Sequence, residues 1–153
     1  MPIRVPIRMR GLSSKGTSRF CHNNVTNMVD RYGGKRLVGH TIESYKWGLE
    51  VLDHSVWITP EHKVVCITKG NYSKEIVDNG YVVFLPREID QTPDTLVKNF
   101  YYDFVVRGNS VEFLNNKGTY RTVKLRNARK LIEDNYKMDL RESMRVCNFL
   151  ECA

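Results

Sequence analysis

Residues 21–42 read CHNNVTNMVDRYGGKRLVGHTI, and the hydrophobic pattern changes halfway through this stretch. The apolar residues of the first half are spaced i, i+3, i+4 and i+7, at Val25, Met28, Val29 and Tyr32. That spacing places them on one helical face. Two glycines follow, and glycine commonly stands just past a helix end. We therefore expect a helix over about 23–32 that stops at Gly33-Gly34.

The segments after the glycines are rich in β-branched and aromatic residues and alternate in part, which is typical of strands. They read KRLVGHTIESYKWGLEVLDHSVWIT (35–59), KVVCIT (63–68), NGYVVFLP (79–86), YYDFVVRG (101–108), VEFL (111–114) and GTYRTVKL (118–125). Residues 59–62, TPEH, predict a turn between the first two segments. We expect the NGYVVFLP strand to stop at Pro86, and residues 87–98 to form a loop or a short helix.

The two ends of the chain differ in character. Residues 1–19 hold two prolines and the run GLSSKGTS, which argue against a helix and predict an extended basic arm. Residues 126–150 are helical in type, and the expected inward positions are Leu131, Ile132, Leu140, Met144 and Cys147. The pattern predicts an α+β fold in one domain, 1–153, in which a helix packs on an antiparallel sheet and a helical segment closes the chain. Within it we distinguish the arm 1–19, a core 20–86, and additional strands and helices over 87–153.

The positive charge of the chain, +7 at neutral pH, is concentrated in two acid-free clusters. The first consists of Arg4, Arg8, Arg10, Lys15 and Arg19, and the second of Lys117, Arg121, Lys124, Arg126, Arg129 and Lys130. Such clusters suit a polyanionic partner, either nucleic acid or an acidic protein. A solvated basic face without a partner explains them as well, and no RNA-binding signature accompanies them.

Several classes of protein are excluded by pattern. No apolar run approaches the roughly 18 to 20 residues of a membrane span, so we expect no membrane contact. The basic N-terminal stretch has no apolar segment behind it, unlike a signal peptide. Cys21, Cys66, Cys147 and Cys152 show no CxxC spacing, which indicates reduced thiols and a cytoplasmic protein.

Cys21 is the first candidate for chemistry because it stands at the expected helix start. Exposed backbone N–H groups at that position lower the pKa of a thiol and can stabilise an oxyanion. A thiolate nucleophile also needs a base within reach. His22 is a poor candidate, because neighbouring helical side chains point about 100° apart. His54, on a later strand, is the better one.

The register of the two strands that carry His54 and Cys66 decides whether these residues meet. A three- or five-residue turn over 59–63 places both on the same face of the sheet, whereas a four-residue turn places them on opposite faces. The first arrangement is favoured because Val56 and Ile58 then share a face with Val64. Cys66 would lie opposite or diagonal to His54.

The order CHNNV…YGG…GHTIES…LDHSVW…PEHKVVCIT…FLP resembles a group of small bacterial and phage proteins. Their pattern has a helix-start cysteine in CxxN, a double glycine, H-x-V-W, V-V-D-I/V-T and F-L-P, and it is similar to papain-like or transglutaminase-like cysteine hydrolase cores. The resemblance covers about 18–86. It implies Cys21 as nucleophile, His54 as general base and acid, and Asn24 as a residue that supports the helix start or lines the site.

One position departs from that pattern, because Cys66 stands where the orienting aspartate is expected. A thiol is a weak hydrogen-bond partner and does not stabilise an imidazolium as a carboxylate does. The protein then has a low turnover rate, orients His54 through another carboxylate such as Asp53 or Glu43, or is catalytically silent. An upstream glutamine for an oxyanion hole is also missing. The residues close enough to substitute are Ser13, Ser14, Thr17 and Ser18.

The resemblance thus implies a papain-like cysteine hydrolase or acyl transferase that acts on an amide, ester or isopeptide bond without a cofactor. The alternative is a catalytically silent basic module that binds nucleic acid or an acidic protein. The plainer alternative for Cys21, His54 and Cys66 is an ordinary place in the core. A zinc site with His22, His40 or His62 as a further ligand, and a Cys21–Cys66 disulfide, also stay open.

Overall fold

The computed structural model describes residues 2–8, 21–45, 48–68, 74–90, 103–115 and 118–136. Three predicted segments fall partly or wholly outside these ranges: most of the arm, residues 91–98, and the helical segment beyond 136. The expected inward residues Leu140, Met144 and Cys147 lie there, as do Arg10, Lys15, Arg19, Lys117 and Cys152.

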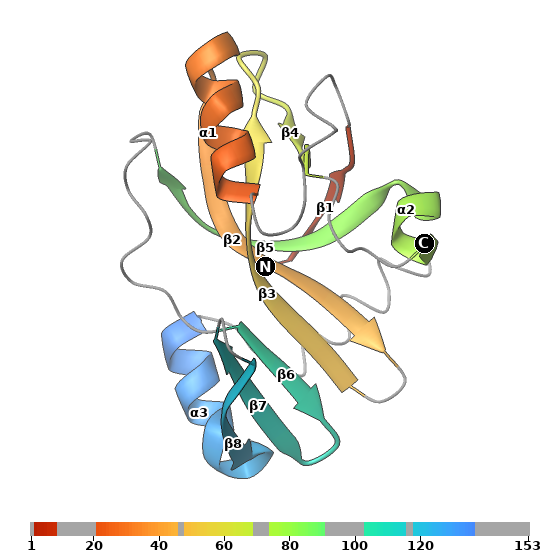
Figure 1. Cartoon of the computed structure of the whole chain (residues 1–153), viewed down its shortest axis with the longest axis vertical. Coiled ribbons are helices and arrows are strands. Elements are labelled where there is room, and N and C mark those ends of the chain that lie inside the picture. Colours follow the sequence, from red (N-terminus) through yellow and green to blue (C-terminus); the bar gives the residue numbers. More distant parts are fainter. Residues whose placement is uncertain are drawn as a thin grey trace.

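The molecule is α+β, as the sequence predicts, with three described helices and an eight-stranded antiparallel sheet (Figure 1). The strand order is β1(Ile3–Pro6), β5(Tyr81–Asp90), β2(Lys35–Tyr45), β3(Gly48–Ile58), β6(Asp103–Arg107), β7(Ser110–Asn115) and β8(Gly118–Lys124), and β4(Val64–Val65) pairs with β3. The helices are α1(Cys21–Tyr32), α2(Lys74–Asn79) and α3(Leu125–Tyr136). None of the three is long and apolar enough to cross a membrane.

Helix α1 packs on one face of β3 through its apolar stripe. Its buried residues and those of the strands beneath form one cluster, made of Val25, Met28, Trp57, Val65 and Ile67. The helix ends as predicted: Gly33 and Gly34 both have positive φ, and the indole N–H of Trp57 donates to the Gly33 carbonyl oxygen at 3.0 Å. This bond fixes the end of α1 to the sheet, so the position of its first turn is set as well.

Helix α3 covers the other half of the sheet (Figure 1). Its residues Ala128 and Ile132 are fully buried in a cluster with Phe104 and Val111. The inward position predicted for Ile132 is confirmed. That for Leu131 is wrong, because this side chain is 45% exposed: it neighbours Ile132 on the helix and so points about 100° away from it.

Strand β5 does not stop at Pro86, as predicted, but continues to Asp90. The neighbour β1 pairs with it only over Tyr81–Phe84, so in the described sheet the backbone of Pro86 has β2 alone beside it. Proline is tolerated where one side of a strand is open or where a bulge interrupts the ladder. A register shift at Val38/Gly39 in β2 supplies such a bulge.

Residues 3–6 are extended, as predicted for the arm, and they form β1 of the sheet. The Arg4 guanidinium lies 4.3 Å from the centre of the Tyr81 ring on the neighbouring strand. Beyond β1, a backbone bond from Arg8 to Cys66, at 2.8 Å, joins the chain to the end of β4. The first residues therefore belong to the sheet that holds Cys66.

Strand β3 has different neighbours along its two edges. One edge pairs with β2 over the whole strand. The other pairs with β6 over Gly48–Val51 and with β4 over Trp57–Ile58. Between these two pairings, residues 52–56 have no partner strand on that side within the described sheet. This interval contains His54.

Candidate active site at the start of helix α1

Cys21 is the first residue of α1 and is 3% exposed. Its thiol interacts with the imidazoles of His22 and His54, and both act on its pKa. Burial by itself raises the pKa of the thiol, but the bonds with His22 and then His54 outweigh burial and lower the pKa to about 6. At neutral pH the sulfur is therefore largely a thiolate, the nucleophilic form.

His22 interacts with Cys21, contrary to the prediction that it turns away. Its Nε2 hydrogen-bonds with Asp53 Oδ2 at 2.6 Å, and its Nδ1 contacts the Ser55 hydroxyl. The expected divergence of about 100° between neighbouring side chains still leaves both on the half of the helix that faces β3. Asp53 and Ser55 share a face of this strand, and the imidazole is long enough to reach both.

The Asp53 carboxylate sets the charge of His22. Burial lowers the pKa of this imidazole, but the hydrogen bond with Asp53 and the bond with Cys21 raise it to about 9. Because a carboxylate only accepts hydrogen bonds, Nε2 carries a proton, and the nitrogen that can exchange a proton with a substrate is Nδ1, which also contacts the Ser55 hydroxyl. Cys21, His22 and Asp53 thus form a continuous thiol–imidazole–carboxylate chain.

His54 and Cys66 lie on one face, as the favoured arrangement predicts, and of the two turn lengths that allow it the structure has the five-residue one, over 59–63. Trp57 pairs with Val65 and Ile58 with Val64, which places Cys66 diagonal to His54. His54 Nε2 lies 3.3 Å from Cys66 Sγ. Both residues are buried, His54 at 3% and Cys66 at 0% exposure. The pKa of His54 is raised: burial opposes the charged imidazole, but interactions with Cys66 and with Cys21 outweigh it.

The site lies at the open edge of β3. Asp53 and His54 point to opposite faces of the strand. Cys21 nevertheless interacts with His54 and with His22, the partner of Asp53. A thiol with partners on both faces must lie beside a strand edge. The β2 edge is filled, so Cys21 occupies the interval at residues 52–56 between β4 and β6.

Asp103, at the start of β6, closes one end of this interval. Its Oδ1 accepts a hydrogen bond from the backbone N–H of Asp53 at 2.6 Å. In the described sheet no strand pairs with this part of β3 on that edge, so the carboxylate replaces a strand as the acceptor. Burial raises the pKa of Asp103 to about 6; the bond from Asp53 opposes this, and the charges of Asp53 and Cys21 add to it. Asp103 thus fixes the backbone that carries Asp53.

Asn24 lies one turn into α1 and is 8% exposed. Its side-chain amide donates to Thr68 Oγ1 at 3.4 Å, and the Cys66 thiol lies 3.8 Å from the Thr68 carbonyl oxygen. Asn24 therefore joins the first turn of the helix to the chain after β4. This contact fits the role of supporting the helix start.

Gly39 faces His54 across the β2–β3 pair. A Cβ at Gly39 would collide with the Leu85 carbonyl oxygen and lie 2.8 Å from the ring of Phe84. The Phe84 ring in turn meets the His54 imidazole edge-on, with centroids 6.2 Å apart. Glycine here leaves the room in which Phe84 packs against His54.

The remaining two histidines lie in a turn and on β2. His62 lies in the exposed turn after β3, as expected. His40 is 1% exposed on β2 and pairs with Asp53. Among the described residues no group of three His, Cys, Asp or Glu side chains could hold a metal ion, so the zinc alternative has no support there. Cys21 and Cys66 are not joined in a disulfide.

The hydroxyl residues weighed for an oxyanion hole, Ser13, Ser14, Thr17 and Ser18, lie outside the described residues. The sequence reasoning missed the roles of His22 and Asp103 and weighed Asp53 only as a substitute orienter. Strand alternation offered one signal, because Asp53 and Ser55 flank His54 and must share the face opposite to it. No protein-family model, curated protein or solved structure matches the chain.

Proposed function

We propose that the chain is a cysteine-dependent hydrolase or acyl transferase of the papain-like or transglutaminase-like type, with Cys21 as nucleophile and His22 as its acid–base partner. One observation carries the proposal: His22, which interacts with the Cys21 thiol, hydrogen-bonds to the Asp53 carboxylate at 2.6 Å. Thiol, imidazole and carboxylate in that order are what nucleophilic acyl chemistry requires. Free thiols at Cys21 and Cys66 fit a reducing compartment, and we assign the activity to the cytoplasm.

His22 rather than His54 fits the acid–base role for two reasons. Its side chain is 19% exposed and so lies at the margin of the site, where a substrate can meet it, while His54 is 3% exposed behind the thiol. His22 also has a carboxylate partner, whereas the partner of His54 is the Cys66 sulfur. His54 supports the thiolate from its buried side, and Cys66 positions His54.

The reaction begins with the thiolate–imidazolium pair. The Cys21 sulfur attacks the substrate carbonyl carbon, and the carbonyl electron pair moves to oxygen. Backbone N–H groups at the start of α1 are the donors that stabilise this oxyanion. When the tetrahedral intermediate collapses, the bond from carbon to the leaving nitrogen or oxygen breaks, and His22 Nδ1 gives its proton to the leaving group.

The second half-reaction releases the acyl group from Cys21. His22, now neutral, takes a proton from water as the water oxygen attacks the thioester carbonyl. The carbon–sulfur bond breaks, and the thiolate and the imidazolium are both restored. If an amine attacks in place of water, the same steps give a new amide, so hydrolysis and acyl transfer share one site.

The test uses an activated acetyl ester, p-nitrophenyl acetate, which needs no knowledge of the natural substrate. We expect release of nitrophenol and an acetyl group on Cys21 in the mass spectrum of the stopped reaction. Cys21→Ser should abolish both, and Cys66→Ser, at the neighbouring buried thiol, should retain the acetyl group on Cys21. Acetylation spread evenly over the four cysteines, or absent altogether, would contradict the proposal.

A further inference from the structure

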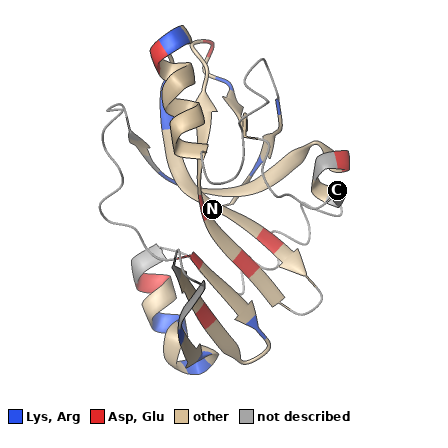
Figure 2. Ribbon diagram, in the orientation of Figure 1, with Lys and Arg blue, Asp and Glu red and all other residues tan. Residues whose placement is uncertain are grey.

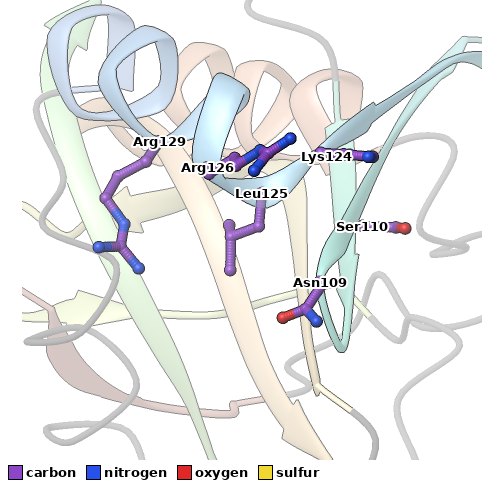
Figure 3. Close-up of a pocket in the computed structure, with 6 residues that line it drawn as sticks. All are labelled: Asn109, Ser110, Lys124, Leu125, Arg126 and Arg129. Atoms are coloured by element: carbon purple, nitrogen blue, oxygen red, sulfur yellow. The ribbon is translucent and has the colours of Figure 1, made fainter.

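A pocket of about 630 Å³ lies at the start of α3 (Figure 3). Its described lining comes from two parts of the chain: Asn109 and Ser110 at the β6–β7 turn, and Lys124, Leu125, Arg126 and Arg129 at the end of β8 and the first turn of α3. The Leu125 N–H donates to the Asn109 carbonyl oxygen at 2.6 Å. This bond joins the two walls, so the pocket has a fixed frame.

The described lining is strongly basic. Three of its six residues are cations and none is a carboxylate. Arg121 and Lys130 are exposed on the same strand and the same helix. Figure 2 shows Lys and Arg at the start of α3, Asp or Glu further along the same helix, and Asp and Glu on the central strands of the sheet. The described lining of the pocket therefore carries a net positive charge.

Arg129 has donor capacity that the described protein does not use. Its Nε is buried and has no hydrogen-bond partner among the described residues. Figure 3 shows the Arg129 side chain extending from α3 into the space beside Leu125. A buried guanidinium N–H without an acceptor is costly, and an anion in the pocket would relieve that cost.

We propose that this pocket binds a phosphate group. Phosphate presents several strong acceptor oxygens, and guanidinium groups match them with paired N–H donors. The Asn109 amide and the Ser110 hydroxyl add neutral partners. The first turn of a helix such as α3 also carries backbone N–H groups that have no acceptor within the helix. The volume falls within the roughly 300 to 1,000 Å³ of pockets that take small molecules. This site is separate from Cys21 and goes beyond the proposed acyl chemistry.

The phosphate has two possible sources, a small phosphorylated molecule or a nucleic-acid backbone. Isothermal titration of the full chain with inorganic phosphate, a mononucleotide and a short single-stranded oligonucleotide distinguishes them. A tighter complex with the oligonucleotide, weakening steeply with salt, identifies the backbone. Equal affinity for the mononucleotide and the oligonucleotide identifies a single phosphorylated ligand. Either result supports a phosphate site, and no binding of any probe at low salt overturns it.

Substitution then tests the position of the site. The double variant Arg126→Gln/Arg129→Gln should weaken binding by about tenfold or more, since hydrogen bonds to charged groups contribute at least that factor. A matched control, Arg31→Gln/Lys35→Gln, removes the same charge at the end of α1 and the start of β2. Equal weakening by both pairs would mean diffuse attraction and would overturn the pocket. Cys21→Ser should bind as the parent does, so failure of the acyl chemistry leaves this result intact.

Discussion

The His22 imidazole donates through Nε2 to Asp53 Oδ2 at 2.6 Å, and this bond joins the first turn of α1 to the middle of β3. It gives the residue next to the candidate nucleophile a carboxylate partner. The Cys66 position, where the sequence pattern leads one to expect an aspartate, has no such group. The chain therefore contains a thiol, an imidazole and a carboxylate in that order. The carboxylate is that of Asp53, the residue before His54 on β3, and not of a residue at the end of β4.

The pH dependence of Cys21 alkylation tests the charge state of the site. The pKa of Cys21 is lowered to about 6, so the thiolate is present above that pH. We expect the rate of iodoacetamide modification to reach half of its maximum near pH 6. Cys152, close to the chain end, is the internal comparison. Half-maximal reaction of Cys21 near the ordinary thiol pKa of about 8.5 would contradict the assignment.

The pH profile of acyl transfer from an anilide should have a decline at high pH that the profile of alkylation lacks. The pKa of His22 is raised to about 9, so its proton is present below that pH and lost above it. We expect kcat/KM with p-nitrophenyl acetate to rise through about pH 6 and to stay level above about pH 9, because nitrophenolate leaves without a proton. With p-nitroacetanilide, whose leaving nitrogen needs a proton, kcat/KM should also fall above about pH 9 as His22 loses its proton.

Asp53→Asn tests the carboxylate directly. The amide cannot stabilise an imidazolium as the carboxylate does, so the pKa of His22 should fall by at least about one unit. The pKa of Cys21 should rise, because its neighbouring imidazole is then neutral at lower pH. Titration of the His22 ring proton by NMR measures the first effect. Asp30→Asn, an exposed site on the same helix, is the control, and an equal shift there would argue against a specific pair.

Cys66→Asp distinguishes the two possible imidazole–carboxylate pairs. Cys66 is fully buried in an apolar cluster with Val56 and Phe84, so a carboxylate there should lower the free energy of unfolding. Because the proposed relay runs through His22, we expect no gain in the acetylation rate. A faster reaction would show that His54 and residue 66 form the working pair. Cys66→Ser, which adds no charge, is the matched control.

Gly39→Ala tests the packing behind His54. The added Cβ meets the Leu85 carbonyl oxygen and the Phe84 ring, so backbone or ring must shift. We expect a loss of about 1 to 3 kcal/mol in the free energy of unfolding, the usual range for overpacking. Chemical denaturation measures it. Gly80→Asn is the control, because a Cβ there has nothing within 4 Å and asparagine tolerates positive φ. Equal losses at both positions would contradict the packing argument.

The sequence predicted those parts of the site that depend on periodicity. Helix spacing gave α1 and its glycine end, and strand alternation placed His54 and Cys66 on one face. It could not predict the His22 contacts, because these depend on where the first turn of α1 lies over β3 and on the reach of the imidazole. The open interval along the edge of β3 could not be predicted either. It arises because β4 and β6 pair with two separate parts of that edge, and the sequence does not show where each pairing stops.

The most direct test of the central claim compares His22→Gln with His54→Gln in single-turnover acetylation of Cys21 by p-nitroacetanilide, whose leaving group needs a proton. Both variants should first be shown to unfold cooperatively, so that loss of rate reports chemistry. We predict that His22→Gln slows acetylation by about 10² to 10⁴-fold and removes the decline above about pH 9, as expected for loss of a general acid–base. His54→Gln should keep that decline and most of the rate. The reverse pattern, with the large loss in His54→Gln, would contradict the account.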